Sequence, residues 1–312
     1  MKVSVIMPVE RIGGDAERAI ASVLGQEAPF PFELIVVSAA PLPEAVRAGV
    51  RNVVEPNRNP ATRRNRAVSE SGGEILAFID DDAVASPDWL ANAIAYLDAH
   101  PDVLALGGPD PAPADSSIAE LISDTLLATP YIGSGVAAHE NRRGTFAVQH
   151  ASDIALVNLF VRRSAFRGFD ESIGYIGEDT ALIEGLMPHV VYTDAVRVFH
   201  RRRAFPRAYL GQRWRYRVKT GQMMRRGSRP PKVRAFLLAG VIGLITLPVS
   251  LPLYVIATFI LGIRRTRLPP RWWPMIPFAF AAHHATYFAG ICWGLLGARA
   301  SRPQSQGVPP GD

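Results

Sequence analysis

The sequence predicts an α/β fold in which helices cover both faces of a mostly parallel sheet. Two short β-branched apolar runs, residues 3–7 and 34–37, read as buried strands, and a helical pattern separates them. The order repeats with a helix over residues 65–71 and a strand over residues 74–79. This alternation favours a parallel sheet, because parallel neighbours need a crossover connection that is usually a helix.

The remaining elements follow in chain order. The first helix is predicted by apolar side chains that share one helical face: Ala16, Ile20, Val23 and Leu24. Residues 86–89 read Ser-Pro-Asp-Trp, a helix start with serine as the cap and proline in the first helical position. A Pro- and Gly-rich insertion spans residues 107–144 and contains one amphipathic stretch at 118–127. We then expect a strand at 153–162, a helix at 180–186 and short strands at 190–192 and 195–199.

The charge of the chain is divided between its two ends. Residues 1–199 contain 15 Lys and Arg against 27 Asp and Glu, a net of −12, whereas residues 200–312 contain 19 against the single Asp312, a net of +18. A hydrophobic content of 48% with 20% charged residues excludes a disordered or coiled-coil chain. The single cysteine, Cys292, excludes a disulfide framework and a cysteine metal site. The sequence therefore predicts an acidic domain, residues 1–200, joined to a basic C-terminal part.

Two long apolar runs in the basic part predict an α-helical membrane region over residues 235–298. Residues 235–263 carry no formal charge, and residues 272–298 are interrupted by His283 and His284. A bilayer core needs about 20 apolar residues in a helix. Each run is therefore long enough to span the membrane or to re-enter it.

The topology of this region stays open. If both runs span, the arginine-rich loop at 264–271 lies outside, against the positive-inside tendency. Pro248 and Pro252 offer the alternative of a first run broken into a re-entrant hairpin, which returns the arginines to the cytoplasmic face. Residues 1–8 lack a signal-peptide layout, so we expect the acidic domain on the cytoplasmic side of the inner membrane. The polar tail, residues 299–312, is expected to be disordered.

Residues 201–234 combine cations with aromatic side chains and predict a basic amphipathic segment at the membrane interface. In a helix, Leu210, Trp214 and Val218 share one face and arginines surround them. Helices of this type lie on anionic membranes, where each cation contributes ~1 kcal/mol. A solvated helix that packs one face on the domain is the alternative. We expect no nucleic acid partner, because the basic run leads directly into apolar segments and no recognised nucleic-acid module surrounds it.

Acidic residues follow the third predicted strand. Asp80, Asp81 and Asp82 stand at its carboxyl end, where ligands bind in open α/β sheets. Three adjacent carboxylates repel one another, so they indicate a divalent cation with diphosphate oxygens, and a solvated acidic turn is the alternative. Strand alternation would project Asp80 and Asp82 to one side and Asp81 to the other. Glu178 and Asp179 form a second acidic pair at a helix start, which is a common position because acids complement the helix dipole.

Several motifs occur in a fixed order along the chain. They are residues 3–8, 61–67, 73–82 and 107–109, Asn158 before 161–163, then 168–171, 177–179 and His200. Together they resemble the family 2 inverting glycosyltransferases of the exopolysaccharide type, which have the A-type nucleotide-sugar fold and a C-terminal membrane anchor. The resemblance spans about residues 3–225. It implies a Rossmann-like sheet, a nucleoside-diphosphate sugar donor and metal-dependent, inverting transfer.

The resemblance also implies a role for each matching position. The nucleotide-sugar would contact Pro8, Val9, Glu10, Arg64, Asp80 and Asp81. The metal, Mn²⁺ or Mg²⁺, would be held by Asp82 with Asp80 and His200, although a structural histidine is an equal alternative for His200. Asp179 would be the general base, with Glu178 beside it. Apart from the resemblance, we expect the acceptor or a lipid phosphate to meet Asn158 and residues of the basic segment: Arg201, Arg202, Arg213, Trp214 and Arg217.

A general base indicates the class of acceptor. In a single displacement, a carboxylate takes the proton from the attacking hydroxyl while the metal neutralises the leaving nucleoside diphosphate, and the anomeric carbon is inverted. A polyprenyl phosphate is already ionised at neutral pH, so Asp179 favours a hydroxyl of a lipid-linked sugar or glycan. The alternatives are a polyprenyl-phosphate glycosyltransferase and a non-catalytic, membrane-bound partner that binds a nucleotide-sugar. The nucleotide base of the donor stays open, because no carboxylate follows the strand at 34–37. The donor sugar, the linkage and the oligomeric state stay open as well.

Overall fold

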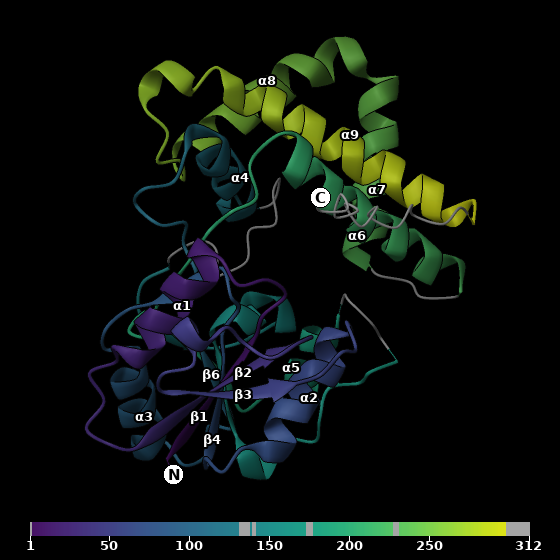
Figure 1. Ribbon diagram of the computed structural model, residues 1–312. Helices are drawn as coiled ribbons and strands as arrows, with labels where there is room; N and C mark the ends of the chain where they lie inside the picture. Colours follow the sequence, from purple (N-terminus) through teal and green to yellow (C-terminus); the bar gives the residue numbers. More distant parts are fainter. Residues whose placement is uncertain (1, 131–137, 139–141, 173–176, 227–230, 298–312) are drawn as a thin grey trace, which may run out of the picture. The chain divides into compact units, whose positions relative to one another are not determined.

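The computed structural model divides the chain into two compact units, residues 1–202 and 203–312. It describes residues 2–130, 138, 142–172, 177–226 and 231–297 (Figure 1). The division falls at residue 202, against the boundary at residue 200 expected from the charge pattern. The tail expected to be disordered, residues 299–312, lies outside the described residues.

The first unit is built on an eight-stranded sheet with the order β3-β2-β1-β4-β8-β6-β9-β7. Its strands are β1 (Val3–Pro8), β2 (Phe32–Ser38), β3 (Val50–Val54), β4 (Ile75–Phe78), β6 (Ala105–Gly107), β7 (Thr145–Ala147), β8 (Leu159–Arg162) and β9 (Val190–Thr193). All run in one direction except β8 and β7. The predicted α/β fold with a mostly parallel sheet is therefore confirmed. A separate antiparallel pair joins β5 (Ala83–Ala85) to β10 (Val198–His200).

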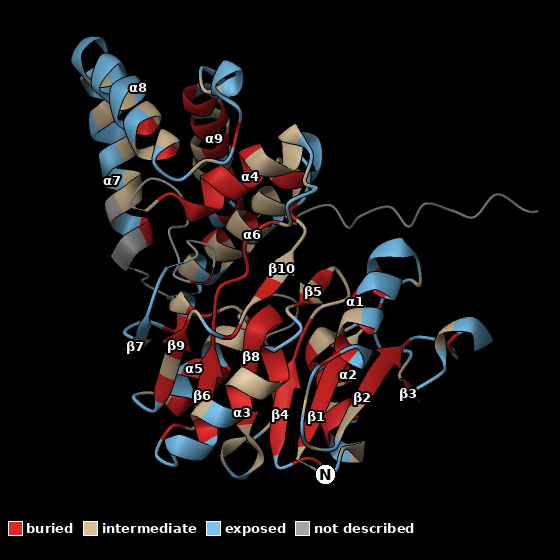
Figure 2. Ribbon diagram, turned by 90° about the vertical axis from the view of Figure 1, so that its left-hand side faces the viewer, coloured by how far each residue is buried: buried red, intermediate tan, exposed pale blue. Residues whose placement is uncertain are grey.

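Helices cover both faces of this sheet (Figures 1 and 2). The helices of the unit are α1 (Gly14–Leu24), α2 (Pro60–Glu70), α3 (Trp89–Ala99), α4 (Ile118–Ala128) and α5 (Glu178–Leu186). α1 and α3 bury their apolar residues in one core, and α2 and α5 in another. β1 contributes to both, Met7 to the first and Ile6 to the second, because successive side chains of a strand point to opposite faces. Because helices cover both faces of the sheet, a ligand can reach it only at the ends of the strands.

Local chemistry explains where the helices begin. The side chain of Asn59 accepts a hydrogen bond from the backbone of Ala61, so α2 begins at residue 60 and not at the predicted residue 65. Ser117 caps α4 in a reciprocal capping box. The predicted cap of α3 at Ser86 is wrong, because the helix begins three residues later, with Asp88 in the cap position.

Short strands account for most of the remaining differences. The strand predicted at 153–162 is wrong in its first part, where two 3₁₀ turns precede β8. β3, β6 and β7 were not predicted; they have five, three and three residues, and pairing with neighbouring strands forms them. Such context dependence is general for strands, whose intrinsic propensities are weak.

The second unit is helical in its described residues. Its helices are α6 (Arg207–Arg225), α7 (Pro231–Ile245), α8 (Leu247–Ile263) and α9 (Met275–Leu295). α6 and α9 pack backbone to backbone at glycines: a Cβ atom added at Gly294 would lie 2.1 Å from the Val218 carbonyl oxygen, and one at Gly221 would lie 2.2 Å from the Ile291 carbonyl oxygen. Side chains larger than glycine would force these two helices apart.

Both histidines of the second apolar run join α9 to another helix. The Tyr209 hydroxyl lies 2.9 Å from Nδ1 of His283, and the Tyr254 hydroxyl lies 2.9 Å from Nδ1 of His284. His283 thereby links α9 to α6, and His284 links α9 to α8. Both side chains contribute to helix packing.

Within the described residues, no helix combines the length and the apolar character that a bilayer crossing requires. The first apolar run is broken at Thr246 into α7 and α8, of 15 and 17 residues, ahead of Pro248. The expected spanning helices are therefore not supported. Many apolar side chains of α7 and α8 are nevertheless exposed, among them Ile245 at 78% and Val249 at 68%, and α8 is largely pale blue in Figure 2.

Candidate functional site

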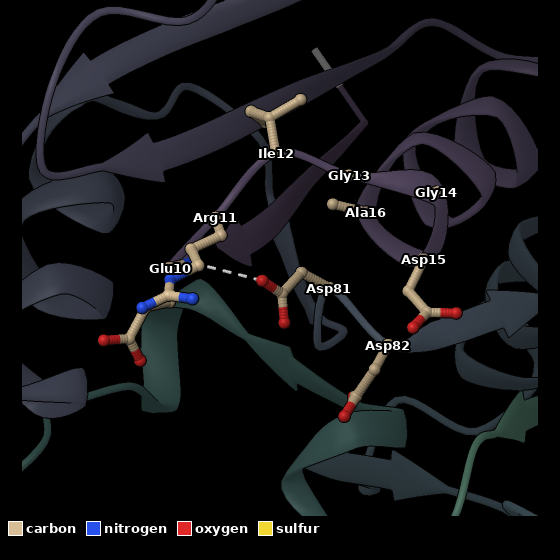
Figure 3. Close-up of a pocket in the computed structure, with 9 residues that line it drawn as sticks. All are labelled: Glu10, Arg11, Ile12, Gly13, Gly14, Asp15, Ala16, Asp81 and Asp82. Atoms are coloured by element: carbon tan, nitrogen blue, oxygen red, sulfur yellow. Dashed lines mark hydrogen bonds between the residues drawn. The ribbon is translucent and has the colours of Figure 1, made fainter. Parts of the chain in front are cut away.

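A cleft of about 540 Å³ opens beside the carboxyl ends of β1 and β4 (Figure 3). It is lined by residues 10–16, which connect β1 to α1, and by Asp81 and Asp82. Gly13 and Gly14 at the start of α1 leave the backbone uncovered on this side. Ligands of open α/β sheets bind at such strand ends.

Asp81 is fixed against the cleft wall. One of its carboxylate oxygens accepts a hydrogen bond of 3.1 Å from the backbone N–H of Glu10, drawn as a dashed line in Figure 3. Burial raises the pKa of Asp81 to about 6, and the charges of Asp82 and Asp80 add to the rise while the bond from Glu10 opposes it. The triplet therefore repels further negative charge unless a cation is present.

Asp80 turns to a different partner. Nη2 of Arg64, on α2, lies 2.9 Å from Oδ1 of Asp80, and Nη1 of the same guanidinium lies 3.4 Å from Oε1 of Glu178, on α5. β4 ends at Phe78, before the triplet, so strand alternation does not set the directions of Asp80 and Asp82, and their expected common side stays a prediction. Arg64 thus contacts both acidic motifs, residues 80–82 and 178–179, which are almost 100 residues apart in the chain.

Asp82 pairs with His200 across the β5–β10 ladder. Nε2 of His200 lies 3.2 Å from Oδ1 of Asp82, and Nδ1 lies 3.2 Å from Oδ2 of Asp110. The pairing of His200 with Ala83 in the two-stranded sheet produces this contact. Burial alone would lower the pKa of His200, but the two carboxylates outweigh it and raise the pKa to about 10.

The 3.2 Å between Oδ1 of Asp82 and Nε2 of His200 is the distance of an ion pair. A carboxylate oxygen and a neutral imidazole nitrogen are both metal ligands, so the pair would hold an ion only after His200 gives up its proton. Asp80 contacts Arg64, and among the described residues no group of three His, Cys, Asp or Glu side chains is arranged to hold a metal. Metal binding by Asp82, Asp80 and His200 therefore stays a prediction.

Asp110, which contacts His200, belongs to a buried ion network with Arg202 and Asp124. Arg202 and Asp110 are 3% and 0% exposed, and Nη1 of Arg202 lies 3.2 Å from Oδ2 of Asp110. Nε of Arg202 lies 2.9 Å from Oδ1 of Asp124 on α4. Arg202 therefore holds the end of β10 in place, and these contacts occupy the guanidinium expected to meet an acceptor.

Asp179 stands at the first turn of α5, next to the buried Glu178. Its Oδ1 accepts a hydrogen bond of 2.7 Å from the backbone N–H of Thr180. Gly177 precedes the helix with φ of 101°, a left-handed conformation that favours glycine. The arrangement keeps the Asp179 side chain partly exposed beside the anchored Glu178.

Three further predicted residues have structural contacts. Val9 is 1% exposed and lies in the core, whereas Pro8 is partly exposed at the end of β1. Asn158 is fully buried, and its amide bonds Trp89 and two backbone carbonyls. Arg201 pairs with Asp115 at 2.7 Å and with a second carboxylate on α4. Val9 is therefore not a side-chain lining of the cleft, and Asn158 is not available to an acceptor in this arrangement.

Sequence reasoning missed Asp110 and Asp124. Asp110 follows the Gly107–Pro109 motif directly, and Asp124 lies inside an apolar helix, where a carboxylate needs a partner. The carboxylate of Asp124 inside the apolar stretch 122–128 could have indicated a buried cationic partner. Arg213, Trp214 and Arg217 lie in the second unit, on α6, and their contact with an acceptor stays a prediction.

Comparison with known sequences gives two matches. Residues 4–167, just over half of the chain, match the family model described as Glycosyl transferase family 2. The glucosyl-dolichyl phosphate glucuronosyltransferase of Haloferax volcanii is 32% identical over 120 residues, which cover 35% of this chain and 38% of that protein. This chain thus matches well under half of the relative's length.

Comparison with solved structures supports the fold. The mannosyltransferase PcManGT of Pyrobaculum calidifontis, in complex with GDP-Man and Mn²⁺, is similar with a TM-score of 0.53 and 21% identity, covering 92% of this chain and 86% of that one. A structure of S. aureus TarS, residues 1–349, is 14% identical and covers 96% of this chain and 92% of that one. Its TM-score of 0.46 does not establish a shared fold. The first similarity shows an A-type nucleotide-sugar fold.

Proposed function

Because the chain belongs to glycosyltransferase family 2, we propose that it is a metal-dependent, inverting glycosyltransferase. It moves a sugar from a nucleoside-diphosphate sugar to a hydroxyl of a lipid-linked sugar or glycan. The Arg64 bridge carries the proposal. It connects Asp80, beside the cleft, to Glu178, beside Asp179, at 2.9 and 3.4 Å, and so joins the donor motif to the motif of the general base.

The donor occupies the cleft between residues 10–16 and the acidic turn. Asp82 and His200 would hold a divalent ion, which would offset the charge of the leaving nucleoside diphosphate. Glu10 and the exposed backbone of Gly13 and Gly14 line the nucleotide. The similar mannosyltransferase was solved with GDP-Man and Mn²⁺, which supports the use of a divalent metal.

Asp179 removes the proton from the acceptor hydroxyl as that oxygen attacks the anomeric carbon. The bond from Thr180 orients one carboxylate oxygen, and Arg64 fixes the neighbouring Glu178. Attack from the side opposite the leaving diphosphate inverts the anomeric carbon. The base is needed because a hydroxyl, unlike a phosphate, carries its proton at neutral pH.

Two observations support a lipid-linked acceptor at a membrane. The Haloferax volcanii relative is a glucosyl-dolichyl phosphate glucuronosyltransferase, and its name gives a sugar on a lipid phosphate. In this chain, α7 and α8 expose large apolar side chains such as Leu238 and Leu253, each at 62%. We place the first unit on the cytoplasmic side of the inner membrane, with the second unit in contact with lipid.

The test supplies the full chain with Mn²⁺, a panel of nucleoside-diphosphate sugars and three acceptors. The acceptors are a lipid-linked sugar, a bare polyprenyl phosphate and a free sugar, and the products are read by mass spectrometry and by the anomeric configuration in NMR. We expect transfer to the lipid-linked sugar with inversion. Transfer to the bare phosphate alone would make the chain a polyprenyl-phosphate glycosyltransferase, and metal-dependent donor binding with neither transfer nor hydrolysis would make it a non-catalytic partner.

A further inference from the structure

A cluster of cations and aromatic rings lies along the seam between α6 and α9. Arg213 and Arg217 are one helical turn apart on α6. The Arg217 guanidinium carbon lies 3.7 Å from the ring centroid of Tyr287 on α9, and that of Arg213 lies 4.9 Å from the ring of Tyr216. His283 lies on the same side of α9, one turn before Tyr287, with ring centroids 6.3 Å apart. Five groups able to carry or stabilise positive charge therefore meet at one seam: Arg213, Arg217, His283, Tyr216 and Tyr287.

This cluster has no anion. Within the described residues, the buried Nε atoms of Arg213 and Arg217 have no hydrogen-bond partner. No Asp or Glu occurs in the sequence between Asp194 and Asp312, so the helices of the second unit contain no carboxylate. Burial lowers the pKa of Arg217, and the charge of Arg213 adds to the decrease. The pKa of His283 is lowered well below its usual value by burial, by His284 and by the two arginines.

A buried arginine of the first unit has carboxylate partners that the half-buried Arg213 and Arg217 do not have in the described part of the chain. Arg202, in the first unit, is compensated by Asp110 and Asp124 at 3.2 and 2.9 Å. Cation–π contacts contribute only about 0.5–2 kcal/mol each, less than the penalty for burying an unpaired ion. Arg213 and Arg217 are therefore suited to an anion that arrives from outside, and the planar guanidinium fork fits phosphate oxygens.

An apolar surface continues from the same cluster. The ring of Phe236, on α7, lies 4.3 Å from that of Tyr287, on which Arg217 stacks. Further along α7, Leu238, Ile242 and Ile245 are 62%, 52% and 78% exposed. A ligand that fits both features has a phosphate at one end and a hydrocarbon chain at the other.

We propose that Arg213 and Arg217 bind the terminal phosphate of a polyprenyl-type lipid phosphate, whose chain lies against the exposed apolar side chains of α7. The inference deepens the proposed function and rests on its lipid-linked acceptor, because it gives the lipid part of that acceptor a binding site. It does not depend on the sugar, the nucleotide or the general base.

The test measures binding of the full chain to vesicles, without donor and without turnover. Three vesicle types are compared: phosphatidylcholine alone, phosphatidylcholine with a polyprenyl monophosphate, and phosphatidylcholine with phosphatidylglycerol at equal negative charge. The variants are Arg213→Gln with Arg217→Gln, Arg217→Lys, and Arg215→Gln as the control, since Arg215 is an exposed arginine of the same helix. Inorganic phosphate and pyrophosphate serve as soluble competitors.

We expect selective binding to the vesicles with polyprenyl monophosphate. The double glutamine variant lowers the affinity about tenfold or more for each arginine, as the loss of charge-assisted hydrogen bonds implies. Arg217→Lys lowers it less, and Arg215→Gln leaves the selectivity in place. The melting temperature of the double variant does not fall, because the substitutions remove two half-buried positive charges that no carboxylate of the second unit's helices offsets.

Four results would overturn the inference. They are equal binding of wild type and double variant, equal binding to phosphatidylglycerol vesicles, equally tight binding of inorganic phosphate without vesicles, and a lower melting temperature in the double variant, which would assign the arginines to folding. If the double variant does not fold, Arg217→Lys alone gives the affinity comparison. Absence of glycosyl transfer by the wild type would count against the proposed function and would leave this binding test intact.

Discussion

Arg64 offers the most direct perturbation of the connection between the two acidic motifs. Arg64→Met keeps most of the volume of the side chain and removes the guanidinium that bridges Asp80 and Glu178. Glu178 is 8% exposed in its side chain and Asp80 is 33% exposed. The two carboxylates therefore lose the same partner in very different surroundings.

The magnitude follows from this difference in exposure. The contact with Asp80 is open to water on one side and contributes about 1 kcal/mol or less. The contact with Glu178 is buried, and breaking such a pair costs about 3–5 kcal/mol because a buried charge loses its counterion Arg64. We expect Arg64→Met to lower the free energy of unfolding of the first unit by about 3 kcal/mol, which is roughly 6–12 °C in Tm for a unit of this size.

The assay is a double-mutant cycle in urea, with Glu178→Gln as the second change. Glu178→Gln removes the buried charge, so the double variant recovers part of the stability and the coupling energy is about 2 kcal/mol. Arg66→Met is the matched control, since Arg66 is exposed on the same helix, and its effect stays within about 0.5 kcal/mol. A coupling energy below about 0.5 kcal/mol between Arg64 and Glu178 would refute the reasoning.

Three further predictions concern other parts of the chain. Arg202→Met removes the guanidinium that contacts the buried carboxylates of Asp110 and Asp124 and lowers the free energy of unfolding in urea by about 3–5 kcal/mol; a loss under about 1 kcal/mol would contradict the network. Gly294→Ala places a Cβ 2.1 Å from a backbone oxygen of α6 and lowers Tm, whereas Gly243→Ala, with nothing within 4 Å of the new Cβ, does not; equal melting curves would contradict the α6–α9 contact. Asp82→Asn abolishes the Mn²⁺-dependent rise in Tm with a donor, and the exposed Asp102→Asn keeps it; an unchanged rise in Asp82→Asn would remove Asp82 from the metal site.

Strong patterns in the sequence predicted the central elements of the first unit. The runs at 3–7 and 34–37 are buried strands because β-branched residues fill both faces of a covered sheet. The helix over 14–24 followed from apolar residues on one face. Strands as short as β6 and β7 have three residues each and no periodicity to detect, so their pairing depends on tertiary contacts that the local sequence does not encode.

For the candidate site, the sequence indicated the residues but not their contacts. Carboxylates after a strand mark a strand end, and Asp81 and Asp82 line the cleft there. Arg64 was assigned to the donor, and the structure adds its contacts with Asp80 and Glu178. Arg202 was read as part of a basic run, although its neighbour in space, Asp110, is more than 90 residues away in the chain. Partners this distant are not visible in local sequence.

The central claim is that Asp179 serves as the base for a hydroxyl acceptor. The measurement is the initial rate of transfer by wild type, Asp179→Asn and the control Glu184→Gln, an exposed acid on the same helix, to a lipid-linked sugar and to a bare polyprenyl phosphate. We predict that Asp179→Asn loses roughly 10²–10⁴-fold of its rate on the sugar hydroxyl, as removal of a general base implies, while Glu184→Gln keeps its rate. Full activity of Asp179→Asn on the lipid-linked sugar would contradict the account.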